Sequence, residues 1–172
     1  MRASLTVFSF LLVAACASMD RSQCLNADWY AIGLEDGARG RALERLGEHR
    51  RACAQYNVTP DTARYVAGRN DGLKSFCTYE RGLSEGRAGN NYVAACPAPG
   101  GPAFLAGYNR GRELHELHRR LDDVEREIAG IKSALTKGIA DPRGRAEQLE
   151  RLESLTRESE ALQARISQAE QR

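Results

Sequence analysis

The chain has few aromatic residues, few prolines and almost no net charge. Only 6% of its residues are Phe, Trp or Tyr, five are proline, and the formal net charge is +2 at pH 7. A nearly neutral chain has no net field that would attract nucleic acid or an acidic lipid surface. It also lacks a Ser, Cys or Lys in a nucleophile motif and a phosphate-binding glycine loop after a strand. These absences exclude the common enzyme signatures.

The first sixteen residues have the pattern of a secretion signal. Arg2 is followed by an apolar run, Leu5–Val13, which is too short to span a bilayer permanently, and then by small residues and Cys16. The ending Val-Ala-Ala-Cys resembles the lipobox of bacterial lipoproteins. In that motif fatty acids, palmitate among them, are attached to the cysteine, which becomes the mature N-terminus. The resemblance implies a lipid on Cys16. Since Ala17 stands where an aspartate would retain such proteins in the inner membrane, it also implies the outer membrane, facing the periplasm. Cleavage before Ser18, without a lipid, is the open alternative.

Composition divides the rest of the chain into two parts. All six tyrosines and the tryptophan lie between Trp29 and Tyr108, whereas the chain from Arg112 onward is rich in Glu, Arg, Leu and Gln. We therefore expect an all-α protein, a small disulfide-bonded helical bundle followed by an antiparallel coiled-coil hairpin. The expected divisions are a signal peptide (1–15), a lipidated tether (16–23), a Gly/Cys-rich helical domain (24–112) and the hairpin (113–172).

One motif, an aromatic residue followed by two spaced glycines, occurs four times in the first part. Within each copy the spacing places all three residues on one face of a helix, where another backbone could approach closely. An interior glycine destabilises a helix by about 1 kcal/mol relative to alanine, so close packing must offset it. The copies are Tyr30-x-x-Gly33-x-x-x-Gly37, Tyr65-x-x-Gly68-x-x-x-Gly72, Tyr79-x-x-Gly82-x-x-x-Gly86 and Phe104-x-x-Gly107-x-x-x-Gly111. A reading of these segments as Asp-Gly turns is the alternative.

Four of the five cysteines remain once Cys16 is set aside, an even number suited to disulfides in an oxidising compartment. Cap and breaker residues predict helices over about 26–54, 59–77 and 78–94, and a fourth from about 103. Each cysteine would then lie at the opposite end of a long helix from its sequence neighbour, too far for a bridge. The predicted pairs are Cys24–Cys77 and Cys53–Cys96.

The second part carries a heptad pattern. The first stripe has alternating spacings of three and four, which is typical of a coiled coil. It consists of Leu114, Leu117, Leu121, Val124, Ile128, Ile131 and Leu135. A break near Lys137-Gly138 and Asp141-Pro142 precedes a second stripe from Leu149 to Ala169, which predicts an antiparallel hairpin. Such a hairpin either covers only itself or offers a surface for a partner or a second copy.

Few residues indicate chemistry. His115 and His118 have a spacing that could place two imidazoles on one metal, but no third ligand has a motif and no Cys-x-x-Cys is present. We therefore expect no metal and no cofactor. His49, among arginines, is expected at the surface. Asp36, Asp71 and Glu85 each precede a glycine and would have to converge for hydrolysis.

The order of these motifs resembles an uncharacterised bacterial lipoprotein family, domain of unknown function 2799, over about residues 20–115. The matching elements are Cys24, Trp29-x-x-x-Gly33-x-x-Asp36-Gly37, His49-x-x-x-Cys53, Tyr65-x-x-Gly68-x-x-x-Gly72-Leu73-x-x-x-Cys77 and Tyr92-x-x-x-Cys96-Pro97. The family implies no activity and so assigns no catalytic residue.

The sequence leads us to expect a non-enzymatic envelope lipoprotein that binds a protein partner, or itself, through the hairpin, and no nucleic acid. One alternative is a glycan or peptidoglycan binder with exposed rings gathered around a groove. Those rings would be Trp29, Tyr30, Tyr65, Tyr79 and Tyr108. A periplasmic hydrolase with clustered acids is the other.

Overall fold

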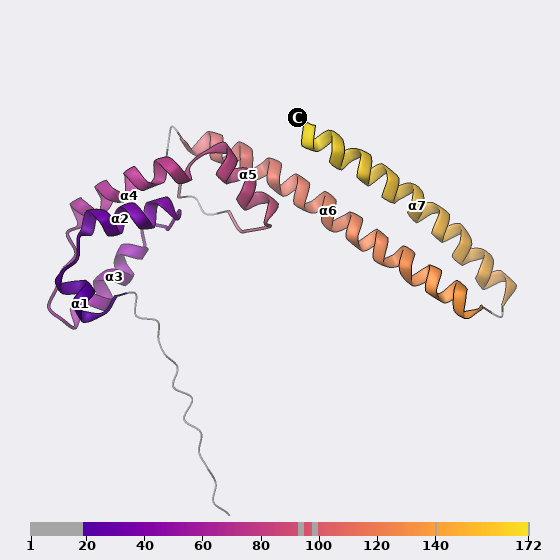
Figure 1. Ribbon diagram of the computed structural model, residues 1–172, viewed down its shortest axis with the longest axis horizontal. Helices are drawn as coiled ribbons and strands as arrows, with labels where there is room; N and C mark the ends of the chain where they lie inside the picture. The colour runs from indigo at the N-terminus through magenta and orange to yellow at the C-terminus, as the bar shows by residue number, and fades with distance from the viewer. Residues whose placement is uncertain (1–18, 93–94, 98–99, 140, 172) are drawn as a thin grey trace, which may run out of the picture.

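The computed structural model describes residues 19–92, 95–97, 100–139 and 141–171, and every regular element in those residues is a helix. The predicted all-α class is thus confirmed. The helices are α1 (Arg21–Leu25), α2 (Trp29–Ala38), α3 (Arg45–Ala54), α4 (Thr62–Phe76), α5 (Tyr79–Arg87), α6 (Gly100–Lys137) and α7 (Pro142–Gln171). They form an elongated molecule with α1 toward one end and the α6–α7 turn at the other (Figure 1).

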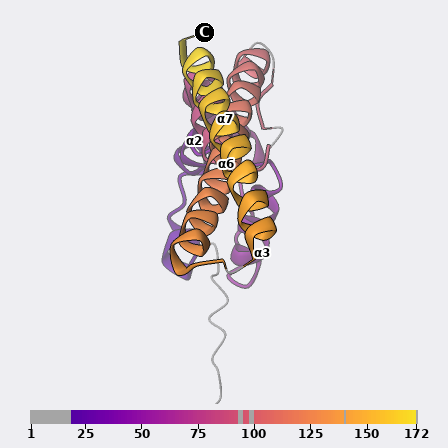
Figure 2. The ribbon, with the colours of Figure 1, turned by 90° about the vertical axis from the view of Figure 1, so that its right-hand side faces the viewer.

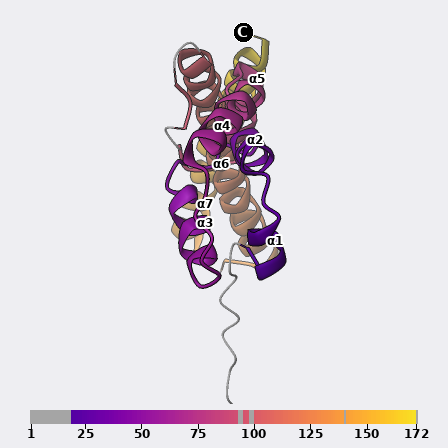
Figure 3. The ribbon, with the colours of Figure 1, turned by 90° about the vertical axis from the view of Figure 1, so that its left-hand side faces the viewer.

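Glycines bring α2 and α4 into direct backbone contact. A Cβ added at Gly33 would lie 2.1 Å from the carbonyl oxygen of Tyr65, and one added at Gly68 would lie 2.0 Å from that of Tyr30. Gly37 and Gly72 repeat this arrangement one turn further along. Only glycine allows such an approach, because any side chain would overlap the neighbouring backbone. The two helices lie side by side (Figure 3).

The same construction joins α5 to the start of α6. A Cβ at Gly82 would lie 2.0 Å from the carbonyl oxygen of Phe104, and one at Gly107 would lie 2.0 Å from that of Tyr79. Gly86 and Gly111 face the backbone of the partner helix as well. All four copies of the motif are therefore helical, and they pack in two reciprocal pairs.

The two pairs are versions of one structural repeat, of which the first runs from Met19 to Phe76 and the second from Cys77 to Gly111. In each, a cysteine precedes the first glycine helix, and a second cysteine lies between the two glycine helices. The first helix also ends alike in both repeats, at a glycine with positive φ: Gly40 (+67°) and Gly89 (+74°). Each glycine amide donates to the carbonyl three residues earlier, and the next amide donates to the carbonyl five residues before it. This is the Schellman termination, which glycine favours because it carries no Cβ.

These terminations overturn the predicted disulfides. The expected helix over 26–54 is broken into α2 and α3 after Gly40, and the expected helix over 78–94 ends at Arg87. The chain reverses at both points and brings sequence neighbours together. The bridges are Cys24–Cys53 and Cys77–Cys96, each with 5.5 Å between the Cα atoms. The predicted pairs Cys24–Cys77 and Cys53–Cys96 were wrong because they assumed unbroken helices.

The tail forms the expected hairpin, although it is not a separate element. α6 runs without a break from the second repeat into the first heptad stripe, so the predicted boundary at 112/113 falls inside a helix. α7 returns along α6, and the two cross when viewed from the hairpin end (Figure 2). Ion pairs Arg120–Glu158 and Arg151–Glu127 join the two helices. Their shared core contains Leu114, Leu117, Val124, Ile131, Leu155, Leu162, Ile166 and Ala169.

Part of the expected tether is folded. Met19 is only 6% exposed and packs in the core of the first repeat, and Asp20 caps α1 by accepting a hydrogen bond from the Gln23 amide. The predicted signal peptide and Cys16 lie outside the described residues. Among the helices described, none has both the length and the apolar character needed to cross a membrane.

Candidate functional site

A buried polar cluster joins three helices of the first repeat. Asp36 lies in α2 one residue before Gly37, where an added Cβ would lie 2.1 Å from the carbonyl oxygen of Arg69 in α4. Its Oδ2 accepts a hydrogen bond from the Tyr65 hydroxyl at 2.8 Å and lies 2.8 Å from Nε2 of His49 in α3. Tyr65 is 0% exposed, His49 4% and Asp36 7%. Because an ionised carboxylate only accepts, Nε2 of His49 carries the hydrogen.

Opposing effects set the proton affinities of this cluster. Burial alone would raise the pKa of Asp36, but the hydrogen bonds from His49 and Tyr65, with the charges of His49 and Arg45 nearby, outweigh it and hold that pKa below its ordinary value. Burial, and then the hydrogen bond to Asp36, raises the pKa of Tyr65. Asp36 is thus a carboxylate and Tyr65 a phenol at neutral pH.

The cluster resembles an acid–base relay that ends at the His49 ring. Nδ1 of His49 is buried and has no hydrogen-bond partner among the described residues. The His49 ring instead packs between Trp29 and Tyr65, with ring centroids 6.4 Å and 5.9 Å away. A cavity of about 390 Å³ borders Asp36 and His49. The geometry favours a role in fixing α2, α3 and α4 against one another.

The burial of His49 contradicts the expected surface position. The signal that could have revealed it is the spacing of Leu46, His49 and Cys53, which places all three on one face of α3. Leu46 and Cys53 are 6% and 0% exposed, so this is the face that packs inward. Neighbouring arginines obscured that pattern in the sequence.

A second tyrosine–aspartate contact joins the same two helices, with the roles of α2 and α4 exchanged. The Tyr30 hydroxyl of α2 donates to Asp71 of α4 at 2.7 Å, and Lys74 also contacts this carboxylate. The hydrogen bonds from Lys74 and then Tyr30 lower the pKa of Asp71. Each helix of the pair therefore contributes one tyrosine donor and one aspartate acceptor to these contacts.

The three acids proposed for a hydrolase have separate partners. Asp36 contacts His49 and Tyr65, while Asp71 contacts Tyr30 and Lys74. Glu85 accepts from Asn90 at 2.6 Å and pairs with Arg81 at 2.8 Å. No shared site for the three carboxylates is seen in these contacts.

The five rings proposed for a glycan site do not gather on one surface. Trp29 and Tyr65 are buried in the first repeat, whereas Tyr79 is 40% exposed in the second. Tyr30 is committed to Asp71. Tyr108 alone among them lines the groove described next.

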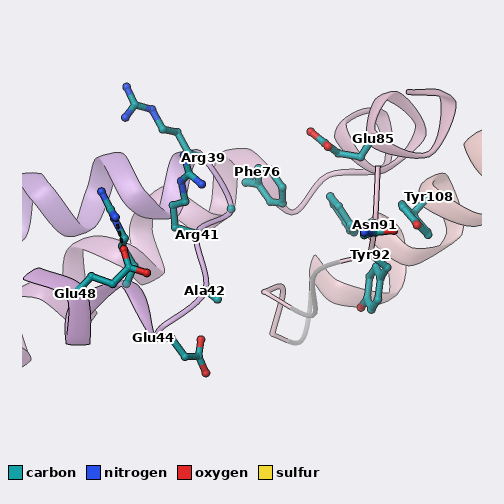
Figure 4. A pocket seen from close by; sticks show the side chains of 13 residues that line it. Arg39, Arg41, Ala42, Glu44, Glu48, Phe76, Glu85, Asn91, Tyr92 and Tyr108 are labelled. Atoms are coloured by element: carbon teal, nitrogen blue, oxygen red, sulfur yellow. Dashed lines mark hydrogen bonds and ion pairs between the residues drawn. The ribbon is translucent and has the colours of Figure 1, made fainter. Parts of the chain in front are cut away.

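A groove of about 390 Å³ lies where the two repeats meet (Figure 4). One wall is the segment from α2 to α3, which contributes Arg39, Arg41 and Arg45. The other comes from the second repeat and includes the rings of Tyr92 and Tyr108. The remaining lining residues are Gly40, Ala42, Glu44, Glu48, Phe76, Glu85, Asn91 and Phe104. Sequence reasoning missed this site because its walls come from segments about 50 residues apart.

Close contacts fix both walls. A Cβ at Gly40 would lie 2.2 Å from the Phe76 ring, so the first wall rests directly on α4. The guanidinium of Arg69 donates two hydrogen bonds, of 3.0 Å and 2.8 Å, to the carbonyl of Arg41. On the other side, the Tyr108 hydroxyl donates to the carbonyl of Asn90 at 2.8 Å.

The histidine pair on α6 has a structural contact. Nδ1 of His115 lies 3.0 Å from the carbonyl of Arg87, and its ring fills the space beside Gly89. Within the part of the chain that the structure describes, no group of three or more His, Cys, Asp or Glu side chains could hold a metal ion.

The sequence model of one family matches residues 28–113, half of the chain, and that family is described as a protein of unknown function (DUF2799). No curated protein and no solved structure matches the chain. The matched segment runs from the cap of α2 to just past Gly111 of α6 and so contains both glycine-packed helix pairs. The chain therefore belongs to the DUF2799 family.

Proposed function

We propose that this protein is a non-enzymatic lipoprotein of the bacterial envelope that presents its α6–α7 hairpin to a protein partner. One observation carries the proposal: α6 is continuous from the glycine-packed second repeat to the tip of the hairpin. At 1.5 Å per residue its 38 residues extend about 57 Å. A hairpin built on a helix that the core also uses is a rigid projection rather than a tethered appendage.

The anchor and the hairpin tip would lie far apart. Only Ala17 and Ser18 separate Cys16 from the buried Met19. A lipid on Cys16 would therefore hold the α1 end of the molecule within about 11 Å of the membrane surface. The hairpin tip lies at the other end of the long axis (Figure 1), so it would face the periplasm.

The apolar stripes of α6 and α7 pack against each other, so a partner would contact the outer faces of the two helices. Leu155 and Leu162 of α7 are 1% and 3% exposed against α6. The exposed outer faces are charged and polar, with Leu149, at 48%, an exception on α7. A partner would therefore recognise a polar rod, and its binding would weaken as salt screens the charges.

The buried cluster supports a non-enzymatic role. Asp36 is bound by Nε2 of His49 and by the Tyr65 hydroxyl, and these contacts join α2, α3 and α4. The separate partners of Asp36, Asp71 and Glu85 give the hydrolase alternative no support.

Site-specific photocrosslinking in intact cells tests the partner surface. We would place the crosslinker at Ser154 or Gln163, both exposed on α7, and in control variants at Leu25 or Arg50, both exposed in the first repeat. The expected result is one common adduct from the α7 positions that the control positions do not give. Adducts from all four positions, or from the control positions alone, would refute the hairpin as the partner surface.

The anchor is tested separately. Cys16→Ser is expected to abolish incorporation of labelled palmitate and to release the chain from the membrane fraction. Membrane retention of an unacylated variant would refute lipid anchoring.

A further inference from the structure

The groove between the two repeats has one aromatic wall. Tyr92 is 42% exposed, and its ring centroid lies 5.3 Å from that of Tyr108 and 6.3 Å from that of Phe104. Phe104 in turn stacks on Phe76 at 5.2 Å, and both are buried. Tyr92 is therefore an accessible ring on a buried aromatic base. Such a ring offers a flat apolar surface beside a polar edge, which suits the C–H faces of a sugar.

The opposite wall carries a cation without a counterion. Arg39 pairs with Glu35 at 2.7 Å, and Arg45 pairs with Glu48, whereas the guanidinium of Arg41 has no ion-pair partner in the described residues. The backbone of Arg41 is nonetheless held in place by the two hydrogen bonds from Arg69. An arginine with a fixed backbone and a free guanidinium can bind a carboxylate through two parallel hydrogen bonds.

The overall charge of the lining limits the ligand. Arg39, Arg41 and Arg45 are balanced by three glutamates, so the groove has no excess positive charge for a polyanion. The carboxylate of Glu44 and the amide of Asn91 add groups that can hydrogen-bond hydroxyls. The lining thus combines an exposed aromatic ring, an arginine without an ion-pair partner, and carboxylate and amide groups, in a volume that suits small ligands.

We propose that this groove binds a saccharide that carries a carboxylate, with a sugar ring against Tyr92 and the carboxylate on Arg41. The site is separate from the hairpin surface, so it stands or falls independently of the partner proposed above. It also differs from the ring cluster expected from the sequence, of which it uses only Tyr108.

Calorimetric titration of the Cys16→Ser chain, beginning at residue 16, tests the proposal with two probes. The first is the disaccharide of N-acetylglucosamine and N-acetylmuramic acid, which carries a carboxylate, and the second is N,N′-diacetylchitobiose, which lacks it. We expect the carboxylated disaccharide to bind at least tenfold more tightly. Absence of binding by either probe at about 10 mM, or equal affinity for the two, would overturn the proposal.

Matched variants localise the site. Tyr92→Ala and Arg41→Gln are each expected to weaken binding of the carboxylated probe at least tenfold, and Arg41→Gln should remove the preference between probes. The controls are Tyr79→Ala, which removes a ring of similar exposure outside the groove, and Arg50→Gln, which removes an exposed arginine of α3. Equal losses in the controls would refute the assignment. Circular dichroism verifies that all four variants fold.

Discussion

The two glycine-packed helix pairs share a backbone arrangement but differ in how side chains reinforce it. In the α2·α4 pair, tyrosines at equivalent positions bind aspartates across the interface, Tyr30 to Asp71 and Tyr65 to Asp36. In the α5·α6 pair, Phe104 replaces the second tyrosine and cannot donate, and Arg110 stands where α4 has Asp71. Backbone contact at glycines is thus common to both pairs, whereas the tyrosine–aspartate hydrogen bonds occur only in the α2·α4 pair.

The second pair has other support. α6 continues into the hairpin, and Leu83 of α5 packs against the hairpin core. The first pair ends at Phe76 and has no such extension. Its disulfide is fully buried, because Cys24 and Cys53 are only 1% and 0% exposed. The comparison indicates that backbone complementarity builds the pair and that the means of securing it can vary.

The largest loss of stability should come from adding a side chain at a glycine that contacts the neighbouring helix backbone. Gly68→Val and Gly107→Val each place a side chain where the added Cβ alone would lie 2.0 Å from a backbone oxygen, so the helices must separate. We expect each to destabilise its pair by more than about 3 kcal/mol, measured by denaturant unfolding. Gly107→Val should spare the α6–α7 hairpin, which has its own core, and so leave a larger helical signal.

Gly130→Ala is the matched control, because a Cβ there meets nothing within 4 Å. It should stabilise α6 by up to about 1 kcal/mol. If Gly68→Val and Gly107→Val were as mild as this control, backbone contact would not be what holds the pairs together.

Replacing either disulfide by serines should lower the free energy of unfolding by about 3 to 4 kcal/mol, since the bridges close loops with sequence separations of 29 and 19.

The two bridges should also differ in how readily they are reduced. Cys96 is half-buried and Cys77 9% exposed, so a thiol can reach this bridge before Cys24–Cys53. Stepwise reduction followed by alkylation and mass spectrometry should label Cys77 and Cys96 first. The opposite order would show that local opening, not static exposure, governs access.

Acid should weaken the first pair through Asp36. Because the folded-state pKa of Asp36 is lowered, its stabilisation is present above the unfolded pKa, near 4, and is lost as pH falls through the lower folded value. Asp36→Asn should lose about 1.5 to 3 kcal/mol at pH 7 and show a flatter decline in unfolding free energy between pH 5 and 2. If the unfolding free energy of Asp36→Asn fell in acid as steeply as that of the unchanged protein, the acid sensitivity would belong to other carboxylates, such as Asp71.

The smallest effects should come from the hydroxyls. Tyr65→Phe gives α4 the side chain that α6 carries at Phe104, and it should cost about 1 to 2 kcal/mol, because the buried Asp36 loses a donor. Tyr30→Phe, at the half-buried edge, should cost about 0.5 kcal/mol. Thermal unfolding of both variants measures the difference. Equal costs would show that burial does not distinguish the two tyrosine–aspartate hydrogen bonds.

Periodic features were readable in the sequence. The four aromatic–glycine motifs and the heptad stripe predicted helices and a hairpin, because residues at those spacings share a helix face whatever the rest of the chain does. The helix ends at Gly40 and Gly89 were missed, although a glycine just past a helix is a recognised stop signal. Missing these two stops was enough to reverse the disulfide assignment.

What the sequence determined by itself is the helical class, the glycine faces and the hairpin, since each depends on short-range spacing. Only the tertiary structure decided which glycine helices pair, which cysteines meet, that His49 is buried against Asp36, and that Arg41 and Tyr92 line one groove. These outcomes depend on the direction the chain takes after each helix. After α2 and α5 that direction is set by the positive-φ glycines Gly40 and Gly89, together with the packing of residues distant in the sequence. No local pattern in the sequence records that packing.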